Sequence, residues 1–571
     1  IIEQLVAGRL ELNALTDKVG SVSYSESSNW LNENTLTWKT QFKKRHNLDV
    51  LGGFTVQKQT SKSYGRSANL IPTAFENLGM NSLDLGTQLR VDTFQSIWSM
   101  ASFIGRVNYN YNSKYFLTAS MRADGSSKFP TENHWGYFPS GALSWKFNNE
   151  KFLKKSKVLS DGKLRVSYGQ TGNNRVGDFD YLTTYYNPIG NSYVFNNQYV
   201  GGVVPLTLGN SQLKWETTEQ FDLGLDLGFF KQRIAINIDA YNKTTKDLLL
   251  RAQLPLSSGY STALKNIGSV QNQGLEFTLD TRNIETKDFT WSSSFNIAFN
   301  ESKVIALSDN QVDLQSTINW DNKWSSTPAY IAKIGEPLGM MYGYVSDGTY
   351  KYDDFDNVGG VYTLKATVPT NGNIRANIQP GDIKYKDLNG DLVVNSSDYT
   401  VIGHGLPKHI GGFTNNFTYK GFDLNVFFQW SYGNDILNAN RIMFDGNSVN
   451  NNYLNQFASY QNRWSPDNPT SDIFRTKGYY GGGYSSQYVE DGSFLRLKTV
   501  SLGYNFDSNW VKKMNIKSIR LYMSAQNIAT WTKYSGPDPE VNVYNSALTS
   551  GFDFSAYPRA RTITFGTNII F

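Results

Sequence analysis

The clearest pattern along the chain is an alternation of large apolar residues with polar ones. In residues 422–432, FDLNVFFQWSY, every second residue from Phe422 to Tyr432 is apolar, and polar residues fill most positions between them. A period of two places the apolar side chains on one face of an extended strand. The segments QRIAINIDAY and SIRLYMSAQN repeat the pattern. The chain is therefore predicted to be all-β.

Fifteen segments of this kind can be placed along the chain, and their connections alternate between short and long. The predicted strands are at about 34–45, 48–59, 97–111, 114–124, 136–148, 163–170, 214–228, 231–244, 263–282, 287–302, 406–420, 421–433, 491–507, 515–530 and 557–571. The long connections are 60–96, 171–213, 303–405 and 434–490. Tight turns at one end and long loops at the other are typical of an outer-membrane β-barrel with periplasmic turns and extracellular loops. A soluble β-sandwich also alternates, but its connections are mostly short.

Two local features concern the last strands. The apolar phase runs through Leu495 and Leu497 and resumes one residue out of step at Val500, so we predict a β-bulge near Thr499. The final segment, TITFGTNIIF, ends with Ile569 and Phe571 on its apolar face. A terminal aromatic residue on an alternating strand resembles the signal read by the barrel-assembly machinery, although it is also what a plain last strand looks like.

Composition narrows the chemistry available to the chain. Of its 571 residues none is Cys, which excludes disulfides, thiolate metal sites and cysteine nucleophiles. Its four His (His46, His134, His404 and His409) have no metal-ligand spacing, and we do not expect an enzyme. A net charge of +5 without a concentrated basic stripe does not indicate nucleic-acid binding. No apolar run approaches the roughly 20 residues of a membrane-spanning helix, which leaves a soluble protein or a transmembrane barrel.

The stretch KDLNGDLVVNSSDY has the spacing of a calcium-binding loop. Carboxylate and amide oxygens, with one backbone carbonyl, fall at loop positions 1, 3, 5, 7, 9 and 12, from Asp387, Asn389, Asp391, Val393, Asn395 and Asp398. Leu392 stands at position 6 where Gly is usual, and Asp398 is shorter than the usual Glu. The alternative is an Asx-rich turn without metal. If calcium binds, we expect it to brace an extracellular loop rather than regulate the protein.

Aromatic and Gly-rich loop tips are candidate ligand-binding surfaces. Tyr faces and Asn amides suit both sugar rings and extended peptides, and ordinary loop packing is the alternative for any single residue. The candidates are Tyr185, Tyr186, Trp464, Tyr479, Tyr480 and Tyr484. The basic stretch 149–162, which contains Lys151, Lys154, Lys155 and Lys157, is predicted to be a solvated turn on the periplasmic side.

Several segments together resemble the SusC/RagA family of TonB-dependent outer-membrane transporters. They occur in the family's order from about residue 115 to the C-terminus: SMRADGSSKF, WGYFPSGALSW, LRVSYGQTGNN, KWETTEQFDLGLD, NIGSVQNQGLEF, GDIKYKDLNGD, DGSFLRLKTVSLGYNF and YPRARTITFGTNIIF. The resemblance implies a transmembrane antiparallel barrel of 22 strands around a plug. Counting back from Phe571, residues 1–571 would hold about the last 15–16 strands, with part of one in residues 1–14. The plug and N-terminal domains are expected outside this chain, which would be the C-terminal portion of a longer polypeptide.

The resemblance also implies a function and its partners. It implies TonB-dependent import of oligomeric nutrients, glycan or peptide, across the outer membrane of a Gram-negative bacterium. The implied partners are a SusD-like lid lipoprotein, the TonB complex acting through the absent N-terminal part, and the lipid bilayer with its lipopolysaccharide. A passive porin, or a barrel serving a secretion, assembly or adhesion complex, remains the alternative.

Overall fold

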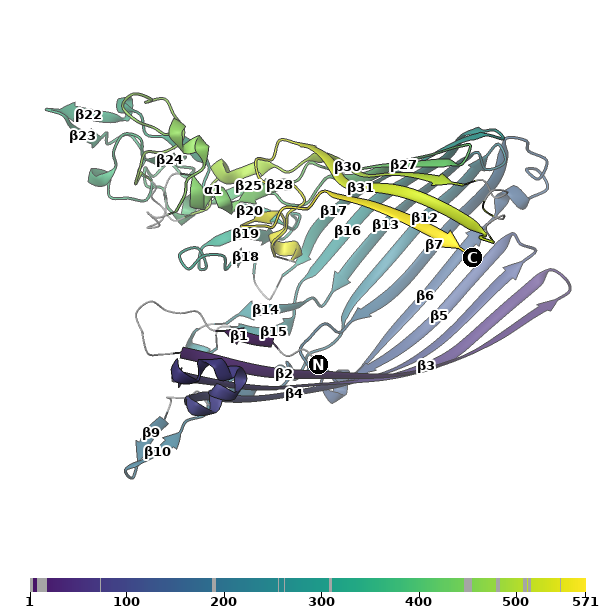
Figure 1. The fold of residues 1–571 in the computed structure, drawn as a ribbon, viewed down its shortest axis with the longest axis horizontal. Helices are drawn as coiled ribbons and strands as arrows, with labels where there is room; N and C mark the ends of the chain where they lie inside the picture. The colour runs from purple at the N-terminus through teal and green to yellow at the C-terminus, as the bar shows by residue number, and fades with distance from the viewer. Residues whose placement is uncertain are drawn as a thin grey trace. The chain divides into compact units, whose positions relative to one another are not determined.

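Antiparallel strands make up most of the computed structural model, which describes residues 4–7, 18–71, 73–186, 192–254, 256–260, 262–307, 311–445, 454–478, 483–506, 511, 515–544 and 546–571 (Figure 1). One sheet has 16 strands, ordered β1-β2-β3-β4-β5-β6-β7-β12-β13-β16-β17-β26-β27-β30-β31-β33. Their bounds are β1 (Gln4–Ala7), β2 (Lys18–Phe42), β3 (His46–Ile71), β4 (Thr87–Tyr111), β5 (Tyr115–Ser126), β6 (Trp135–Trp145), β7 (Leu159–Asn173), β12 (Glu216–Phe229), β13 (Ile234–Lys246), β16 (Ser269–Glu285), β17 (Phe289–Ala306), β26 (His409–Tyr419), β27 (Phe422–Tyr432), β30 (Phe494–Asn505), β31 (Ser518–Thr532) and β33 (Thr562–Ile570). Each of the fifteen predicted strands overlaps one of these, and β1 lies in the stretch where part of a further strand was expected.

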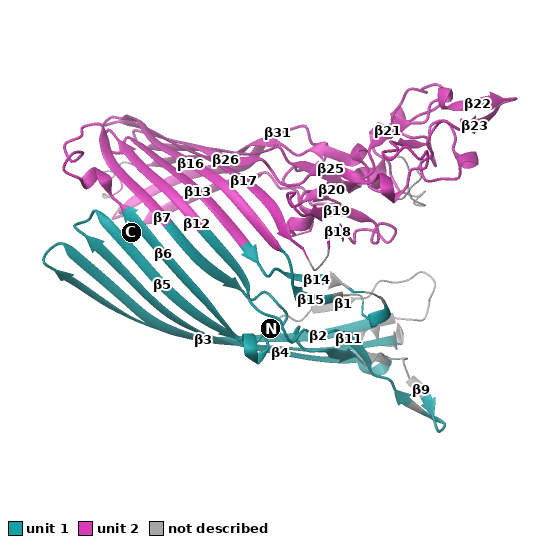
Figure 2. Ribbon diagram, turned by 180° about the vertical axis from the view of Figure 1, so that it is seen from behind, with its two compact units in different colours: residues 1–144, 167–220, 245–268 teal, residues 145–166, 221–244, 269–571 magenta. Residues whose placement is uncertain are grey.

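The chain divides into two compact units (Figure 2). Unit 1 comprises residues 1–144, 167–220 and 245–268, and unit 2 comprises residues 145–166, 221–244 and 269–571. Strands β1 to β6 belong to unit 1, apart from Trp145 at the end of β6, and β16 to β33 of the main sheet belong to unit 2. Strands β7, β12 and β13 are divided between the two units. None of the described helices is both long and apolar enough to cross a membrane.

The first strands of unit 1 correct one prediction, because most of residues 60–96 is not a loop. Strand β3 continues to Ile71 and β4 begins at Thr87, and their pairing includes Lys62 with Gln95. Only residues 72–86 connect them, mostly as the 3-10 segment η1 (Thr73–Leu85). Residues 61–69, SKSYGRSAN, have too few apolar side chains to alternate. Backbone pairing continues through this extension, with local side-chain contacts such as the stacked rings of Tyr24 and Tyr64, and neither depends on an alternating hydrophobic pattern.

In unit 2 the register separates an apolar face from a polar face. One row across the apolar face pairs Trp291, Phe417, Leu424, Leu502, Met523 and Phe565. One row across the polar face pairs Asn296, Gly412, Gln429, Arg496 and Thr530. The rings of Trp291 and Phe417 stack with centroids 5.7 Å apart. Cross-strand pairs of this kind stabilise the sheet and fix its register.

The predicted β-bulge is confirmed. Phe427 pairs with Thr499, whereas its neighbour Phe428 pairs with Leu497, so Lys498 is the extra residue on β30. The pairing of β30 with β31 also changes register at this point, between Leu497 and Thr499. Leu495 and Leu502 are seven positions apart, a separation that would place them on opposite faces of a regular strand. The extra residue keeps both on the same face.

The long connections of unit 2 fold together as a loop domain, defined as the described parts of residues 311–405, 434–491 and 533–556. It contains a four-stranded sheet of β18 (Asp313–Thr317), β19 (Pro328–Lys333), β20 (Met340–Gly343) and β25 (Thr400–His404). A second sheet joins β28 (Asp435–Asn438) to β29 (Val489–Asp491) and β32 (Phe552–Asp553). Tyr330, Met341, Tyr484 and Phe552, all fully buried, share one core. Three separate connections thus form one folded body.

The two faces predict different responses to a buried charge. Val426 lies on the apolar face of β27 and Asn425 on its polar face. In lipid vesicles we expect Val426→Arg to lower the free energy of unfolding by about 2–4 kcal/mol, because a charge near the bilayer midplane is costly. Asn425→Arg, the matched control, should lower it by about 1 kcal/mol or less. Urea unfolding followed by tryptophan fluorescence measures both. Equal losses would contradict the assignment of the faces.

Candidate functional site

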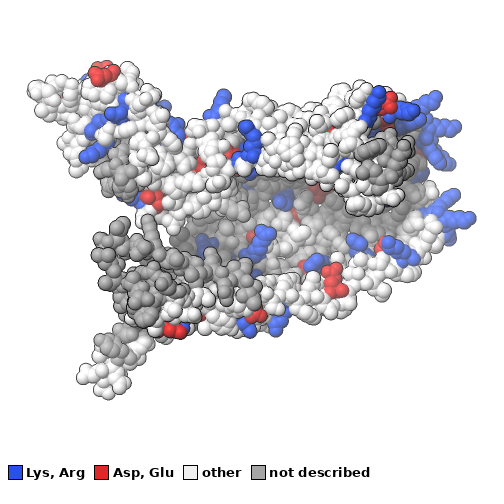
Figure 3. Space-filling view, viewed as in Figure 1, with Lys and Arg blue, Asp and Glu red and all other residues white. Residues whose placement is uncertain are grey.

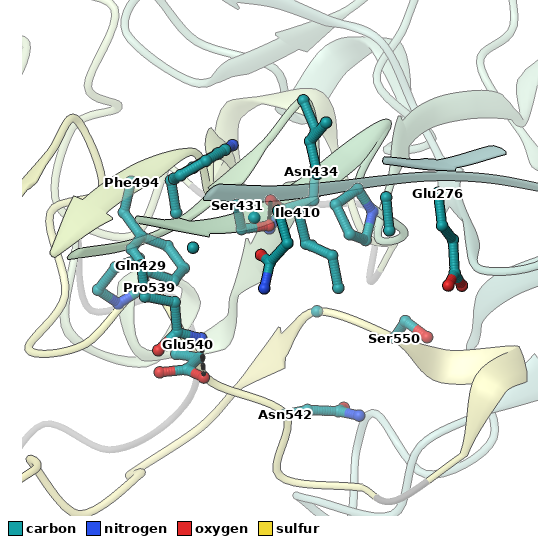
Figure 4. A pocket seen from close by; sticks show the side chains of 18 of the residues that line it. Glu276, Ile410, Gln429, Ser431, Asn434, Phe494, Pro539, Glu540, Asn542 and Ser550 are labelled. Atoms are coloured by element: carbon teal, nitrogen blue, oxygen red, sulfur yellow. Dashed lines mark hydrogen bonds between the residues drawn. The ribbon is translucent and has the colours of Figure 1, made fainter. Parts of the chain in front are cut away.

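A pocket of about 800 Å³ lies in unit 2 between the polar face of the sheet and the segment that follows β31 (Figure 4). Strands β16, β17, β26 and β27 supply one wall, and residues 539–551 of the loop domain supply the other. Figure 4 shows Glu276 and Glu540 at opposite ends of the view, with Ser431, Asn434 and Asn542 between them. The pocket is therefore walled by both the sheet and the loop domain.

The period of two explains which side chains reach the pocket from the sheet. Asn296 of β17 and Gln429 of β27 project from the polar face, and Gly412 of the intervening strand β26 lies between them in the register. A Cβ on Gly412 would come within 3.1 Å of the Asn296 Oδ1 and 3.0 Å of the Phe427 ring. Gly412 thus leaves room for these side chains at the pocket floor.

The other wall, residues 533–556, is a strap held to the sheet by buried charges. Arg496 projects from the polar face of β30 with only 2% of its side chain exposed. It donates to Asp538 Oδ1 at 2.6 Å and to Glu540 Oε2 at 3.0 Å. Arg559 lies 2.9 Å from Glu540 and 3.3 Å from Asp538, and Lys498 lies 3.7 Å from Glu540. Three cations surround two carboxylates, which is the compensation that buried charge requires.

Hydrogen bonds from tyrosine hydroxyls hold the rest of the strap in place within the loop domain. Tyr330 donates to the Ser550 carbonyl at 2.9 Å, and Tyr544 donates to the Asn319 carbonyl at 2.6 Å. Tyr534 donates to Asp553. Burial, followed by this hydrogen bond to a carboxylate, raises the pKa of Tyr534. The strap is therefore fastened to residues 319 and 330 of another connection, and its two ends are joined to each other by the bond between Tyr534 and Asp553.

The lining of the pocket suits a neutral, hydrogen-bonding ligand. Amides and hydroxyls come from Asn296, Gln429, Ser431, Asn434 and Asn542, and none of the described lining residues is Lys, Arg or His. Phe427 and Phe494 add aromatic surface. Hydroxyl or amide groups of a ligand can pair with such side chains, whereas the carboxylate of Glu276 disfavours a polyanion.

Sequence reasoning missed the residues that hold this site together. Arg496 lies 42 positions before Asp538 and 44 before Glu540, and no short motif spans such distances. The available signal was weak: a cation on the polar face of a predicted strand, and the Pro-rich stretch SGPDPEV in the connection that follows the next strand.

The structure places the predicted ligand-binding aromatics in different surroundings. Tyr484 is fully buried in the loop-domain core, where its hydroxyl accepts from Trp320 Nε1 at 2.8 Å. Trp464 is 7% exposed and lies 5.5 Å from the Tyr352 ring. Tyr185 and Tyr186 form part of β8 (Thr184–Tyr186) in unit 1 and are exposed. The other two candidates, Tyr479 and Tyr480, lie outside the described residues. The role of all six in ligand binding stays a prediction, and for Tyr484 it would require the core to open.

In the stretch 387–398 the predicted calcium ligands accept hydrogen bonds from the backbone. Asp387 accepts from the N–H groups of Gly390 at 2.7 Å and Leu392 at 2.8 Å. Asp398, fully buried, accepts from Leu388 at 2.8 Å and Asn395 at 2.9 Å. The remaining side-chain acceptors follow the same Asx pattern: Asn389 accepts from the N–H of Asp391, Asp391 from that of Val393, and Asn395 from that of Ser397.

Leu392 resolves one of the two departures from the calcium-loop pattern. Its φ of 63° lies in the left-handed region that the sixth loop residue adopts, which is why Gly is usual there. Desolvation would raise the pKa of Asp387, but hydrogen bonds from the backbone N–H groups of Leu392, Gly390, Asp391 and Asn389 outweigh it and lower the pKa. No cluster of three or more His, Cys, Asp or Glu side chains arranged for a metal occurs among the described residues. The calcium site stays a prediction beside the Asx-turn alternative.

The predicted assembly signal lies at the end of the last strand. Ile569 pairs with Ile519 of β31 and is 43% exposed, and Phe571 is 87% exposed. Both belong to the apolar face predicted from the sequence, and their role in assembly stays a prediction.

Removing Arg496 should release the strap. Arg496→Ala leaves Asp538 and Glu540 short of their main partner, and breaking a buried pair of this kind costs about 3–5 kcal/mol. We expect faster hydrogen–deuterium exchange in residues 534–552. Arg520→Ala removes a similar ion pair, in which Arg520 donates two hydrogen bonds to Asp423. About a third of each of these two side chains is exposed. This control should cost about 1 kcal/mol or less and leave the strap protected. If exchange in Arg496→Ala were unchanged, Arg496 would not be what holds the strap to the sheet.

Calcium binding at 387–398 can be tested separately from the hydrogen bonds of the loop. Asp391→Asn keeps an acceptor for the Val393 N–H but removes a charged ligand. If calcium is bound, this variant should lose metal in elemental analysis and its loop should exchange faster, while the strands keep their protection. If wild-type protein holds no calcium and Asp391→Asn leaves the loop unchanged, the Asx turn without metal is correct.

Comparisons with known proteins agree with the fold and identify the family. Residues 8–414 match the family described as TonB dependent receptor-like, beta-barrel. The chain is 36% identical over 555 residues to TonB-dependent receptor P3 of Formosa agariphila, covering 96% of this chain and 53% of that protein. It is 34% identical over 492 residues to TonB-dependent receptor SusC of Bacteroides thetaiotaomicron, covering 83% of this chain and 44% of that protein.

A solved structure shows the same fold. The RagAB peptide transporter superposes with a TM-score of 0.79 at 24% identity, covering 97% of this chain and 56% of that chain. The chain therefore spans about half the length of the relatives it matches. The family match covers more than half of residues 1–571, and the strands, register and polar face described above are those of a membrane barrel. This chain belongs to the TonB-dependent receptor family, as part of its β-barrel.

Proposed function

We propose that the chain forms barrel wall in an outer-membrane transporter that imports oligomeric nutrients, glycan or peptide, with energy supplied through TonB. The family match over residues 8–414 carries the proposal. The RagAB structure is that of a peptide transporter, which supports the peptide part of this substrate range. In this transporter the chain would have three roles: sealing the membrane, presenting a polar lumen and capturing the substrate.

The two faces of the unit-2 sheet fit the first two parts. The apolar face, with rows such as Trp291, Phe417 and Leu424, meets lipid chains, and the polar face lines the lumen. The turns between β6 and β7 and between β26 and β27 then lie on the periplasmic side. The loop domain lies on the extracellular side, at the other ends of the strands.

The pocket under the strap fits the third part. It opens on the polar face near the ends of β26 and β27 from which the loop domain emerges, so a ligand entering from outside meets it early. Its amides suit hydroxylated or peptide groups, and the carboxylate of Glu276 disfavours polyanionic ligands. A SusD-like lipoprotein would cover the loop domain as a lid. We expect the plug and the segment that contacts TonB to lie outside residues 1–571.

Pocket amides should contribute to uptake. Asn296→Leu or Asn542→Leu in the full-length protein each removes a hydrogen-bonding group, worth about 1 kcal/mol, and should lower uptake at limiting substrate by about fivefold to tenfold. Asn425→Leu is the matched control, because Asn425 lies on the same polar face of β27 outside the pocket. Uptake of labelled oligosaccharide and oligopeptide mixtures measures all three. Equal effects of the three variants would contradict the pocket.

Conductance in planar bilayers separates the proposal from its alternatives. A plugged importer should pass no steady ion current, whereas a passive porin would conduct constitutively. Purification of the full-length protein with a lipoprotein partner supports the lid, and purification with secretion or adhesion proteins instead would favour the second alternative.

A further inference from the structure

We propose that an exposed turn patch of unit 2 binds the phosphate headgroups of anionic phospholipids. The turn patch comprises Phe152, Val158, Phe230, Lys151, Lys154, Lys155, Lys157 and Lys231. It lies on the turn between β6 and β7 and on the turn between β12 and β13. The leaflet is the periplasmic one, an assignment that rests on the proposed function because it follows from the orientation given above. The binding itself does not depend on transport.

The two turns of the patch are joined to each other. The Phe230 N–H donates to the Val158 carbonyl at 2.8 Å, and the Gln232 N–H donates to the Ser160 hydroxyl at 3.0 Å. These two hydrogen bonds hold the turn that carries Lys231 beside the turn that carries Lys157. The lysines therefore belong to one local surface and not to two unrelated turns.

Large apolar side chains are exposed at the centre of this surface. Phe152 is 75% exposed, Val158 is 51% exposed and Phe230 is 50% exposed. A turn that met only water would gain nothing from exposing them. Aromatic and aliphatic side chains beside lysines are instead the composition of segments that lie in the membrane interface.

The lysines of the patch have their charges available. No ion pair within the described part of the chain involves any of the five. The nearby carboxylates have other partners, since Asp161 lies 3.2 Å from Lys146 and Glu150 accepts from Trp145 Nε1 at 3.3 Å. Five cations beside three apolar groups are complementary to a layer of phosphates above acyl chains.

Trp145 places the patch at the level of the headgroups. It is the last residue of β6, whose exposed face also carries Trp135, Tyr137 and Leu143. Aromatic residues at strand ends of membrane barrels lie at the interface between lipid and water. Four of the five lysines follow Trp145 within a dozen residues, and their long stems allow the ammonium groups to reach phosphates.

Other turns of unit 2 carry the same sign of charge. Lys287, Lys420 and Lys517 lie on the turns that follow along the chain, against Glu285 and Asp288. Figure 3 shows Lys and Arg gathered at the ends of the strands where the short turns lie. The turn patch belongs to this basic end and also exposes large apolar side chains.

The test uses the full-length protein in phosphatidylcholine vesicles with and without phosphatidylglycerol. We expect phosphatidylglycerol to raise the thermal unfolding midpoint of the wild type, and the double variant Lys154→Glu, Lys155→Glu to lose at least half of that increase. The matched control is Lys323→Glu with Lys386→Glu, which makes the same charge change on exposed lysines of the loop domain. It should keep the full increase. Native mass spectrometry should show fewer retained phosphatidylglycerol molecules on the first variant only.

The proposal is overturned if phosphatidylglycerol does not stabilise the wild type, or if the control pair loses as much as the patch pair. If the double Glu variant does not assemble, Lys154→Gln with Lys155→Gln applies the same test without charge reversal. Phe152→Ser should also weaken the lipid effect, and an unchanged effect would count against the apolar part of the patch. Failure of uptake would sink the transport proposal and leave this result intact.

Discussion

The structure depends on one constraint: inside a bilayer no water is present to satisfy a backbone N–H or C=O group. Each strand must therefore pair along its length with neighbours, and its side chains can differ only between the two faces. The rows from Trp291 to Phe565 and from Asn296 to Thr530 are the two results of this constraint. The bulge at Lys498 follows from the same constraint, because the extra residue returns the apolar side chains that come after it on β30 to the apolar face of the sheet.

The same constraint decides what could be predicted from the sequence. Alternation in segments such as 422–432 identified all fifteen strands, and a break in that alternation located the bulge. Residues 60–71 and 87–96 were missed because their pairing satisfies the backbone without a lipid-facing pattern, as the Ser-rich stretch 61–69 shows. Where no hydrophobic face is needed, the sequence carries little sign of a strand.

The candidate site was harder to predict than the fold, because distant parts of the chain build it. Arg496 is recognisable as a residue on a polar face, but its partners Asp538 and Glu540 lie beyond the next strand. Similarly, Tyr484 looks like an exposed loop aromatic in sequence and is a core residue in the structure, because three connections fold around it. Charges and aromatic rings in long loops acquire their roles only when those loops pack together.

The proposed import requires energy coupled through TonB. The most direct measurement is uptake of labelled oligosaccharides and oligopeptides by cells that make the full-length protein, with and without a functional TonB. We expect uptake that requires both this protein and TonB and stops when the proton-motive force is collapsed. Uptake that continues unchanged without TonB would contradict it and would indicate a passive channel.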